Sequence, residues 1–103
     1  MRHFLLFYVT APDYLERRPQ YRSVHIEKAR AAKARGELVL AGALADPADQ
    51  AVLWFAATDA HVVEEFARND PYVIHGLVRA WKVRPWTTVI GAQAHAPVHP
   101  QGD

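Results

Sequence analysis

Residues 3–10 are apolar on both alternating faces, and this feature constrains the fold more than any other. The stretch is rich in Phe, Leu, Tyr, Val and Thr, which predicts a β-strand. Side chains alternate between the faces of a strand, so Leu5 and Phe7 lie on one face and Leu6 and Tyr8 on the other. A strand with two apolar faces needs cover on both sides. The sheet that contains it must therefore be covered on both faces.

The length and composition fit one domain with one core. The chain has 103 residues, of which 50% are hydrophobic. Its 12 Lys and Arg nearly balance its 11 Asp and Glu, so no strong field favours nucleic acid or an anionic membrane as a partner. The absence of cysteine excludes disulfides, thiolate metal sites and a cysteine nucleophile.

The N-terminal apolar run is expected to be a strand and not a leader. It is followed by Pro12 and Asp13, and no signal-type cleavage region is present. No other apolar stretch approaches the roughly 20 residues that are needed to cross a bilayer. We therefore expect a cytoplasmic protein.

The rest of the chain predicts two helices and three more strands. Residues 21–35 lack Pro and Gly and are rich in Ala, Lys, Arg and Glu, which predicts a helix that stops at Gly36. The expected elements are a strand at 3–10, a helix at 21–35, strands at 38–42 and 52–56, a second helix capped by Thr58 or Asp59 and interrupted at 69–71, a turn at 72–76 and a last strand at 77–90. We expect Pro85 to lie near a sheet edge or a bulge.

The order βαββαβ predicts an α+β, ferredoxin-like domain over residues 1–91. Four antiparallel strands then carry both helices on one face of the sheet. The other face would be an exposed apolar patch, and a second copy packed sheet to sheet would cover it. We therefore expect a homodimer. Residues 92–103 offer no periodicity and are expected to form a flexible tail.

His25 is the candidate catalytic residue that the helical pattern indicates. It shares one helical face with Arg22 and Ile26. A histidine that is oriented by a carboxylate can act as a general acid or base near neutral pH. Asp70 can supply the carboxylate, because Pro71 restricts its backbone. By periodicity alone the structural alternative is the commoner case, in which His25 is a core histidine and Asp70 satisfies backbone N–H groups.

Three residues are candidates for substrate binding. Arg22 lies one turn before His25 and can hold an anionic or carbonyl oxygen through its planar fork of donors. A solvated arginine is the open alternative. Tyr72 and Tyr8 can shape a pocket and donate hydrogen bonds, although aromatic residues at such positions more often belong to the core.

Neither a metal nor a cofactor is expected. Only His95 and His99 have the i, i+4 spacing of a helical zinc motif, and they fall in a proline-containing stretch. The five glycines are scattered, with no phosphate loop and no dinucleotide fingerprint. Ser23 and His25 are too close in sequence to share a helical face, which disfavours a serine nucleophile.

Four segments, in this order and spacing, resemble the YciI-like family of dimeric α+β barrel proteins. The segments are 22–25, 40–47, 69–77 and 83–86, within a likeness that covers nearly all of residues 2–90. The resemblance implies a ferredoxin-like subunit, a homodimer and an active site built around His25 and Asp70. Many members have Gly-Pro where this chain has Gly42 and Ala43, a difference that concerns the shape of one loop.

Two functions from different classes fit this resemblance. The first is a cofactor-free enzyme in which His25 moves a proton on a small cyclic or aromatic-derived carbonyl compound, as an isomerase, a lyase or a dehalogenase. Relatives of this kind include enzymes that remove chloride from chlorinated quinols. The second is a non-catalytic protein that binds a small molecule or serves an accessory role. A cofactor-free monooxygenase is a third, weaker reading.

Overall fold

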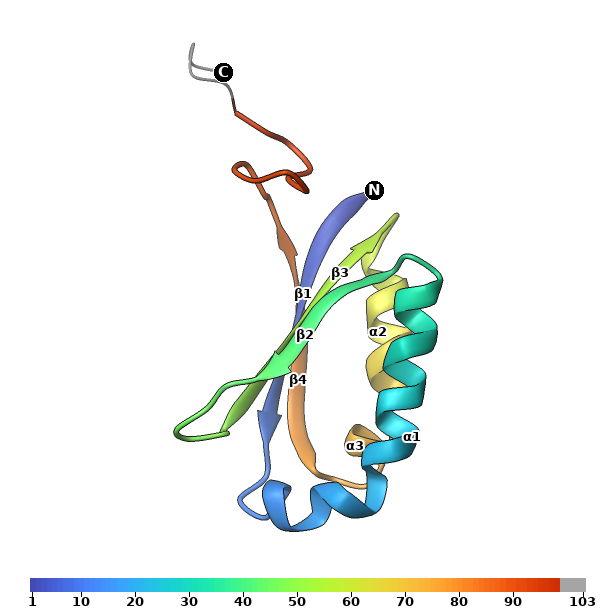
Figure 1. Ribbon diagram of the computed structural model, residues 1–103, viewed down its shortest axis with the longest axis vertical. Helices are drawn as coiled ribbons and strands as arrows, with labels where there is room; N and C mark the ends of the chain where they lie inside the picture. Colours follow the sequence, from blue (N-terminus) through green and yellow to red (C-terminus); the bar gives the residue numbers. More distant parts are fainter. Residues whose placement is uncertain (99–103) are drawn as a thin grey trace.

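The computed structural model describes residues 1–98 and has the predicted ferredoxin-like architecture. Its elements are β1 (Arg2–Thr10), α1 (Tyr14–Ala34), β2 (Leu38–Ala43), β3 (Gln50–Ala57), α2 (Ala60–Arg68), α3 (Pro71–Ile74) and β4 (Val78–Trp86). The strands form one antiparallel sheet in the order β2-β3-β1-β4. All three helices cover the same face of this sheet (Figure 1). The α+β fold class and the split βαβ order are therefore confirmed.

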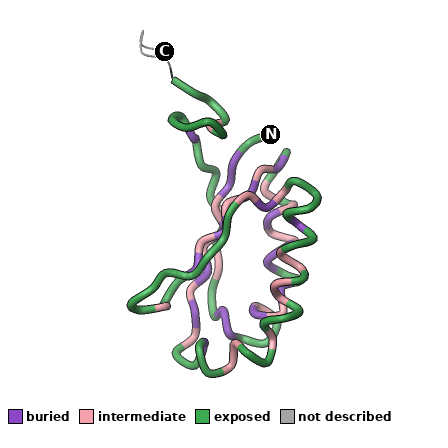
Figure 2. Tube along the Cα trace, in the orientation of Figure 1, coloured by how far each residue is buried: buried purple, intermediate pink, exposed green. Residues whose placement is uncertain are grey.

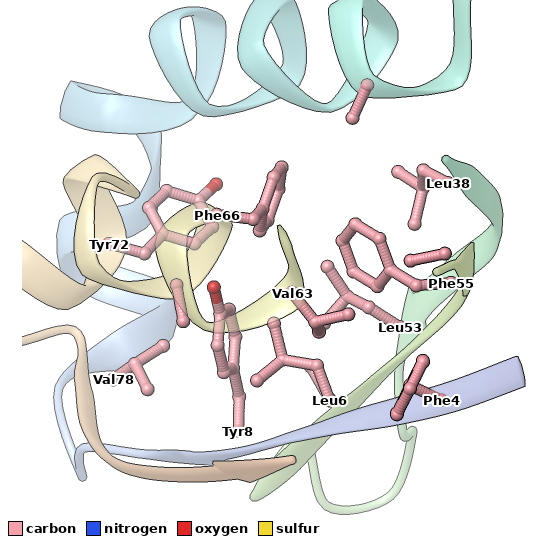
Figure 3. Close-up of a cluster of buried hydrophobic side chains, with 14 of the residues drawn as sticks. Phe4, Leu6, Tyr8, Leu38, Leu53, Phe55, Val63, Phe66, Tyr72 and Val78 are labelled. Atoms are coloured by element: carbon pink, nitrogen blue, oxygen red, sulfur yellow. The ribbon is translucent and has the colours of Figure 1, made fainter. Parts of the chain in front are cut away.

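The core lies between the sheet and α2, and the two faces of β1 are buried unequally. Phe4, Leu6 and Tyr8 point toward the helices and are almost fully buried (Figure 3). From the opposite side of this core, α2 contributes Val63 and Phe66. Asp59 caps α2 by accepting a hydrogen bond from the backbone N–H of His61, as expected for that residue type.

The other face of the sheet carries no helix. Strand pairing places Leu5 of β1 beside Trp54 of β3, and Phe7 beside Val52. These four side chains are only partly buried, and Leu40 of the neighbouring β2 is 68% exposed. The bare apolar sheet face that the sequence predicts is therefore present in the single chain.

Helix α1 begins at Tyr14, which corrects the prediction that the helix starts at residue 21. Tyr14 is buried, and its ring meets that of Tyr72 edge to face at 5.8 Å, so a tertiary contact holds the first turn. Pro19 lies inside the helix and removes one i→i−4 hydrogen bond. The first turns accordingly run at an angle to the rest of α1 (Figure 1).

The end of the chain differs from the prediction in two places. Residues 72–76 were expected to form a turn, but most of this stretch belongs to α3. The last strand was expected to continue to residue 90, but β4 ends at Trp86. Trp86 pairs with His3 at the start of β1, so no partner strand remains for residues 87–90. Pro85 lies on an edge strand, as predicted.

Residues 87–98 lead away from the sheet (Figure 1) and contact it through Thr88. The Thr88 hydroxyl lies 2.7 Å from Nδ1 of His3 and accepts a hydrogen bond from the backbone N–H of His95. The other histidine of the i, i+4 pair with His95, His99, lies outside the described residues. Within residues 1–98, no helix is both long and apolar enough to cross a membrane.

Candidate active site

A cavity of about 460 Å³ opens between α1 and the β2 side of the sheet. This volume is in the range of small-molecule sites. Helix α1 contributes only two buried residues, Tyr14 and Ala32, and its outer surface is exposed (Figure 2). Helix α1 faces the cavity with the small side chain of Ala29 and with Ile26, while β2 lines the opposite wall. Small residues on the inner face of α1 leave the space that the cavity occupies.

His25 and Asp70 meet beside this cavity. Nδ1 of His25 lies 2.9 Å from Oδ1 and 3.1 Å from Oδ2 of Asp70. Asp70 is 0% exposed, whereas the His25 side chain is 15% exposed and lines the cavity. The two residues are 45 positions apart in sequence, and the fold brings them together.

The carboxylate of Asp70 is fixed by the start of α3. Asp70 is the N-cap of this short helix, and Oδ1 accepts the backbone N–H of Tyr72 at 3.0 Å. Pro71 occupies the first helical turn. A backbone N–H has no intrahelical partner at that position, so its absence in Pro costs nothing, and the fixed φ of Pro suits the helix. Asp70 therefore satisfies a backbone N–H group and also contacts His25, so the structure combines the two roles that the sequence left as alternatives.

Tyr8 is a third member of the cluster. Its hydroxyl donates a 2.7 Å hydrogen bond to Oδ2 of Asp70. Burial and the neighbouring Asp70 carboxylate raise the pKa of Tyr8 far above its ordinary value, so the phenol stays protonated and keeps donating. The hydroxyl proton of Tyr8 is thus directed at Asp70, although the side chain also lines the cavity.

The imidazole of His25 is held in place on its face as well as on its edge. Its ring stacks on Tyr72 with centroids 3.8 Å apart and an interplanar angle of 7°. An ionised carboxylate can only accept hydrogen bonds, so Nδ1 of neutral His25 carries the proton and Nε2 carries the lone pair. Such a ring can take a proton at Nε2, which is the chemistry of a general base.

The hydroxyl of Tyr72 is buried without a partner. The Tyr72 residue is 3% exposed, lines the cavity, and its hydroxyl has no hydrogen-bond partner among the described residues. Burial raises the pKa of Tyr72, Tyr14 adds to this effect, and the positive charges of Arg22 and Arg18 oppose it. A protonated phenol without a partner can donate to a ligand oxygen.

The structure brings together all five residues that the sequence singled out. Four of them line the cavity, and Asp70 lies behind His25. Sequence reasoning missed three cationic side chains of the cavity wall, Arg18, Arg30 and Lys33. Helical spacing from Arg22 gives the signal for Arg18, but residue 18 lies before the predicted start of the helix at residue 21.

The described residues around the cavity do not provide the donor set of a metal site. Across residues 1–98, the His, Cys, Asp and Glu side chains form no group of three or more that could hold a metal ion. His25 and Asp70 form only a pair, and in the part of the chain that the structure describes, the residues that line the cavity with His25 include no other His, Asp or Glu.

Fold and site together define a ferredoxin-like α+β domain with a histidine–carboxylate pair at a cavity beside the helical layer. The chain belongs to the YCII-related domain family, whose model matches residues 1–87. This match confirms the family that the sequence segments indicated. No curated protein sequence matches the chain.

Solved structures share the fold. A 5-chloro-2-hydroxyhydroquinone dehydrochlorinase from Burkholderia phenoliruptrix, in complex with 2,5-dihydroxybenzoquinone, is 24% identical with a TM-score of 0.70, and the match covers 84% of this chain and 94% of that one. A NIPSNAP domain protein from Burkholderia xenovorans is 15% identical with a TM-score of 0.51, over 91% and 98% of the two chains. At these identities the likeness shows the fold alone.

Proposed function

We propose that this protein is a cofactor-free enzyme that moves a proton on a small cyclic or aromatic-derived carbonyl compound. The observation that carries the proposal is the His25 ring, whose Nδ1 is held by the fully buried Asp70 while the ring lines a cavity. A buried carboxylate that fixes the tautomer and orientation of a histidine is a recurrent catalytic arrangement. The aromatic rings of Tyr8, Tyr14 and Tyr72 suit a flat ligand.

In the proposed reaction, Nε2 of His25 removes a proton from a carbon next to a carbonyl group. The electron pair of the broken C–H bond moves onto the carbonyl oxygen, and Arg22 and the free hydroxyl of Tyr72 stabilise the resulting oxyanion. The carbonyl then re-forms and the electron pair moves back to carbon. In isomerisation, this pair takes the proton back from Nε2 of His25 at another carbon. In elimination, it forms a C=C bond as chloride leaves with the electron pair of the C–Cl bond, and the proton stays on Nε2 until solvent removes it.

The elimination branch is the type of reaction for which the structurally similar dehydrochlorinase is named. Non-catalytic binding of a small molecule is the competing function. The structural contacts of Asp70 favour it, because Asp70 caps α3 and accepts a hydrogen bond from Tyr8. The two functions differ in whether a bound ligand is turned over.

A ligand screen tests the proposed function. We expect phenols, quinones or lactones to raise the melting temperature of the protein, because a ligand that binds only the folded state stabilises it. Each hit is then incubated with the protein and followed by ultraviolet absorbance and by release of halide. Stabilisation without conversion of any hit would favour the binding protein over the enzyme.

We also propose that the protein is a homodimer, because the sheet face that carries Leu5, Phe7 and Trp54 has no helical cover. Light scattering should give a mass near twice the 11.6 kDa of one chain.

A charge on this face tests the dimer. Phe7→Glu should shift the protein to the monomer, since Phe7 lies on the uncovered face of the sheet. Val24→Glu, which places the same charge at an exposed apolar position of α1, should leave the dimer intact. A wild-type monomer at micromolar concentration that binds no hydrophobic dye would contradict the proposal.

A further inference from the structure

The cavity wall formed by α1 is strongly cationic. Four positively charged side chains line the cavity, and all come from this helix: Arg18, Arg22, Arg30 and Lys33. At 100° per residue these positions fall within an arc of about 120° on an ideal helix, which explains why they share one side. No Asp or Glu is among the cavity-lining residues of the described chain.

The four charges are not neutralised by ion pairs. Among residues 1–98, the arginines that form ion pairs are Arg17, Arg35 and Arg68, and none of these lines the cavity. Glu27 lies beside Arg22 and Arg30 in a separate surface groove on α1, and it forms no ion pair among the described residues. The cavity therefore presents a positive potential to an entering ligand.

Three of these cations, Arg18, Arg30 and Lys33, have no part in the proposed proton transfer. Arg18 and Arg22 precede His25 on α1 and lie at the end of the cavity where Tyr72 has its free hydroxyl. Arg30 and Lys33 follow His25 by five and eight residues, which corresponds to about 7 to 12 Å along the helix axis. A ligand whose reacting oxygen meets Tyr72 can thus reach Arg30 and Lys33 with a group on its far side.

We propose that the substrate of this site carries a carboxylate, which Arg30 and Lys33 hold at the mouth of the cavity while the reacting carbonyl lies at Tyr72 and His25. This inference rests on the proposed function, because it uses the same cavity and the same reacting end. A carboxylate accepts the paired donors of an arginine fork, and a neutral amide of the same shape does not gain the charge attraction. The site then selects aromatic or cyclic acids over their neutral analogues.

A matched pair of probes tests this inference: 2,5-dihydroxybenzoate and 2,5-dihydroxybenzamide, with Kd measured by calorimetry. The benzoate is expected to bind about tenfold more tightly than the amide at low salt. Because Arg30 and Lys33 are exposed, 0.5 M NaCl should remove most of this preference. Equal affinities at low salt, or binding of neither probe at millimolar concentration, would overturn the inference.

Variants assign the preference to the two side chains. Arg30→Gln with Lys33→Gln should reduce the preference to within about twofold and leave the Kd of the amide unchanged. The control, Lys28→Gln with Arg35→Gln, removes one charge from α1 and one from its C-cap residue, both outside the cavity lining, and should keep the preference. A preference that survives in the first variant would overturn the assignment. A preference without turnover of any acid would leave the inference standing and remove the enzyme proposal.

Discussion

Replacement of His25 by alanine is expected to lower kcat by at least about 100-fold while ligand binding changes only a few-fold. General base catalysis by a positioned side chain contributes about 10²–10⁴ to a rate, and His25 offers the ring nitrogen for that step. Arg22 and the Tyr72 hydroxyl remain to bind the ligand oxygen in this variant. The measurement is kcat and Kd for a ligand found in the screen, together with the melting temperature to show that the variant folds.

His75 provides a matched control for this experiment. Its ring stacks on Tyr21 with centroids 4.4 Å apart, much as the ring of His25 stacks on Tyr72, but His75 does not line the cavity. His75→Ala should therefore leave kcat unchanged. If the two alanine variants affected turnover equally, His25 would have no special chemical role.

The sequence was sufficient to predict the order of the strands and helices and five of the residues at the site. The order of elements follows from the two apolar faces of β1 and from residues that start or stop helices, namely Gly36, Asp59 and Pro71. At these positions local propensity and burial agree. The pairing of His25 with Asp70 did not follow from periodicity. The resemblance to the family indicated this pairing, and the fold brings the two residues together although they are 45 positions apart in sequence.

The start of α1 could not be predicted from local rules. The predicted helix is confined to residues 21–35, which lack Pro and Gly, because Pro is unfavourable inside a helix. The buried edge-to-face contact of Tyr14 with Tyr72 overrides that preference, and such a contact is visible only in three dimensions. The same misplacement hid Arg18, while Arg30 and Lys33 resemble ordinary solvated residues until β2 is seen to face them.

The hydrogen bond from Tyr8 to Asp70 was also beyond sequence reasoning. Tyr8 was predicted to bind substrate, and it does line the cavity, but its hydroxyl proton is directed at the carboxylate. We propose that Tyr8 acts as a positioning residue through Asp70. The carboxylate then has three donors around it, from Tyr8, from the backbone of Tyr72 and from His25.

Asp70→Asn is expected to lower kcat by about 100-fold or more and to reduce the free energy of unfolding by about 1–3 kcal/mol. The asparagine side chain has one acceptor oxygen for the three donors that now surround Asp70. If the amide N–H₂ faces His25, the ring proton must move to Nε2, and the lone pair that the base needs is lost. Chemical denaturation and steady-state kinetics on the same preparation measure both effects.

Two further variants separate the chemical effect of Asp70 from its structural effect. Tyr8→Phe removes one donor to the same carboxylate but leaves the contact with His25, so it should cost about 1 kcal/mol of stability and lower kcat less than tenfold. Asp59→Asn makes the same chemical change at the exposed N-cap of α2, where asparagine also caps well, and should alter neither quantity. A purely structural His25–Asp70 pair would give a different result. Asp70→Asn and Tyr8→Phe would then lose stability in proportion to their lost hydrogen bonds, and any change in kcat would follow the folded fraction alone.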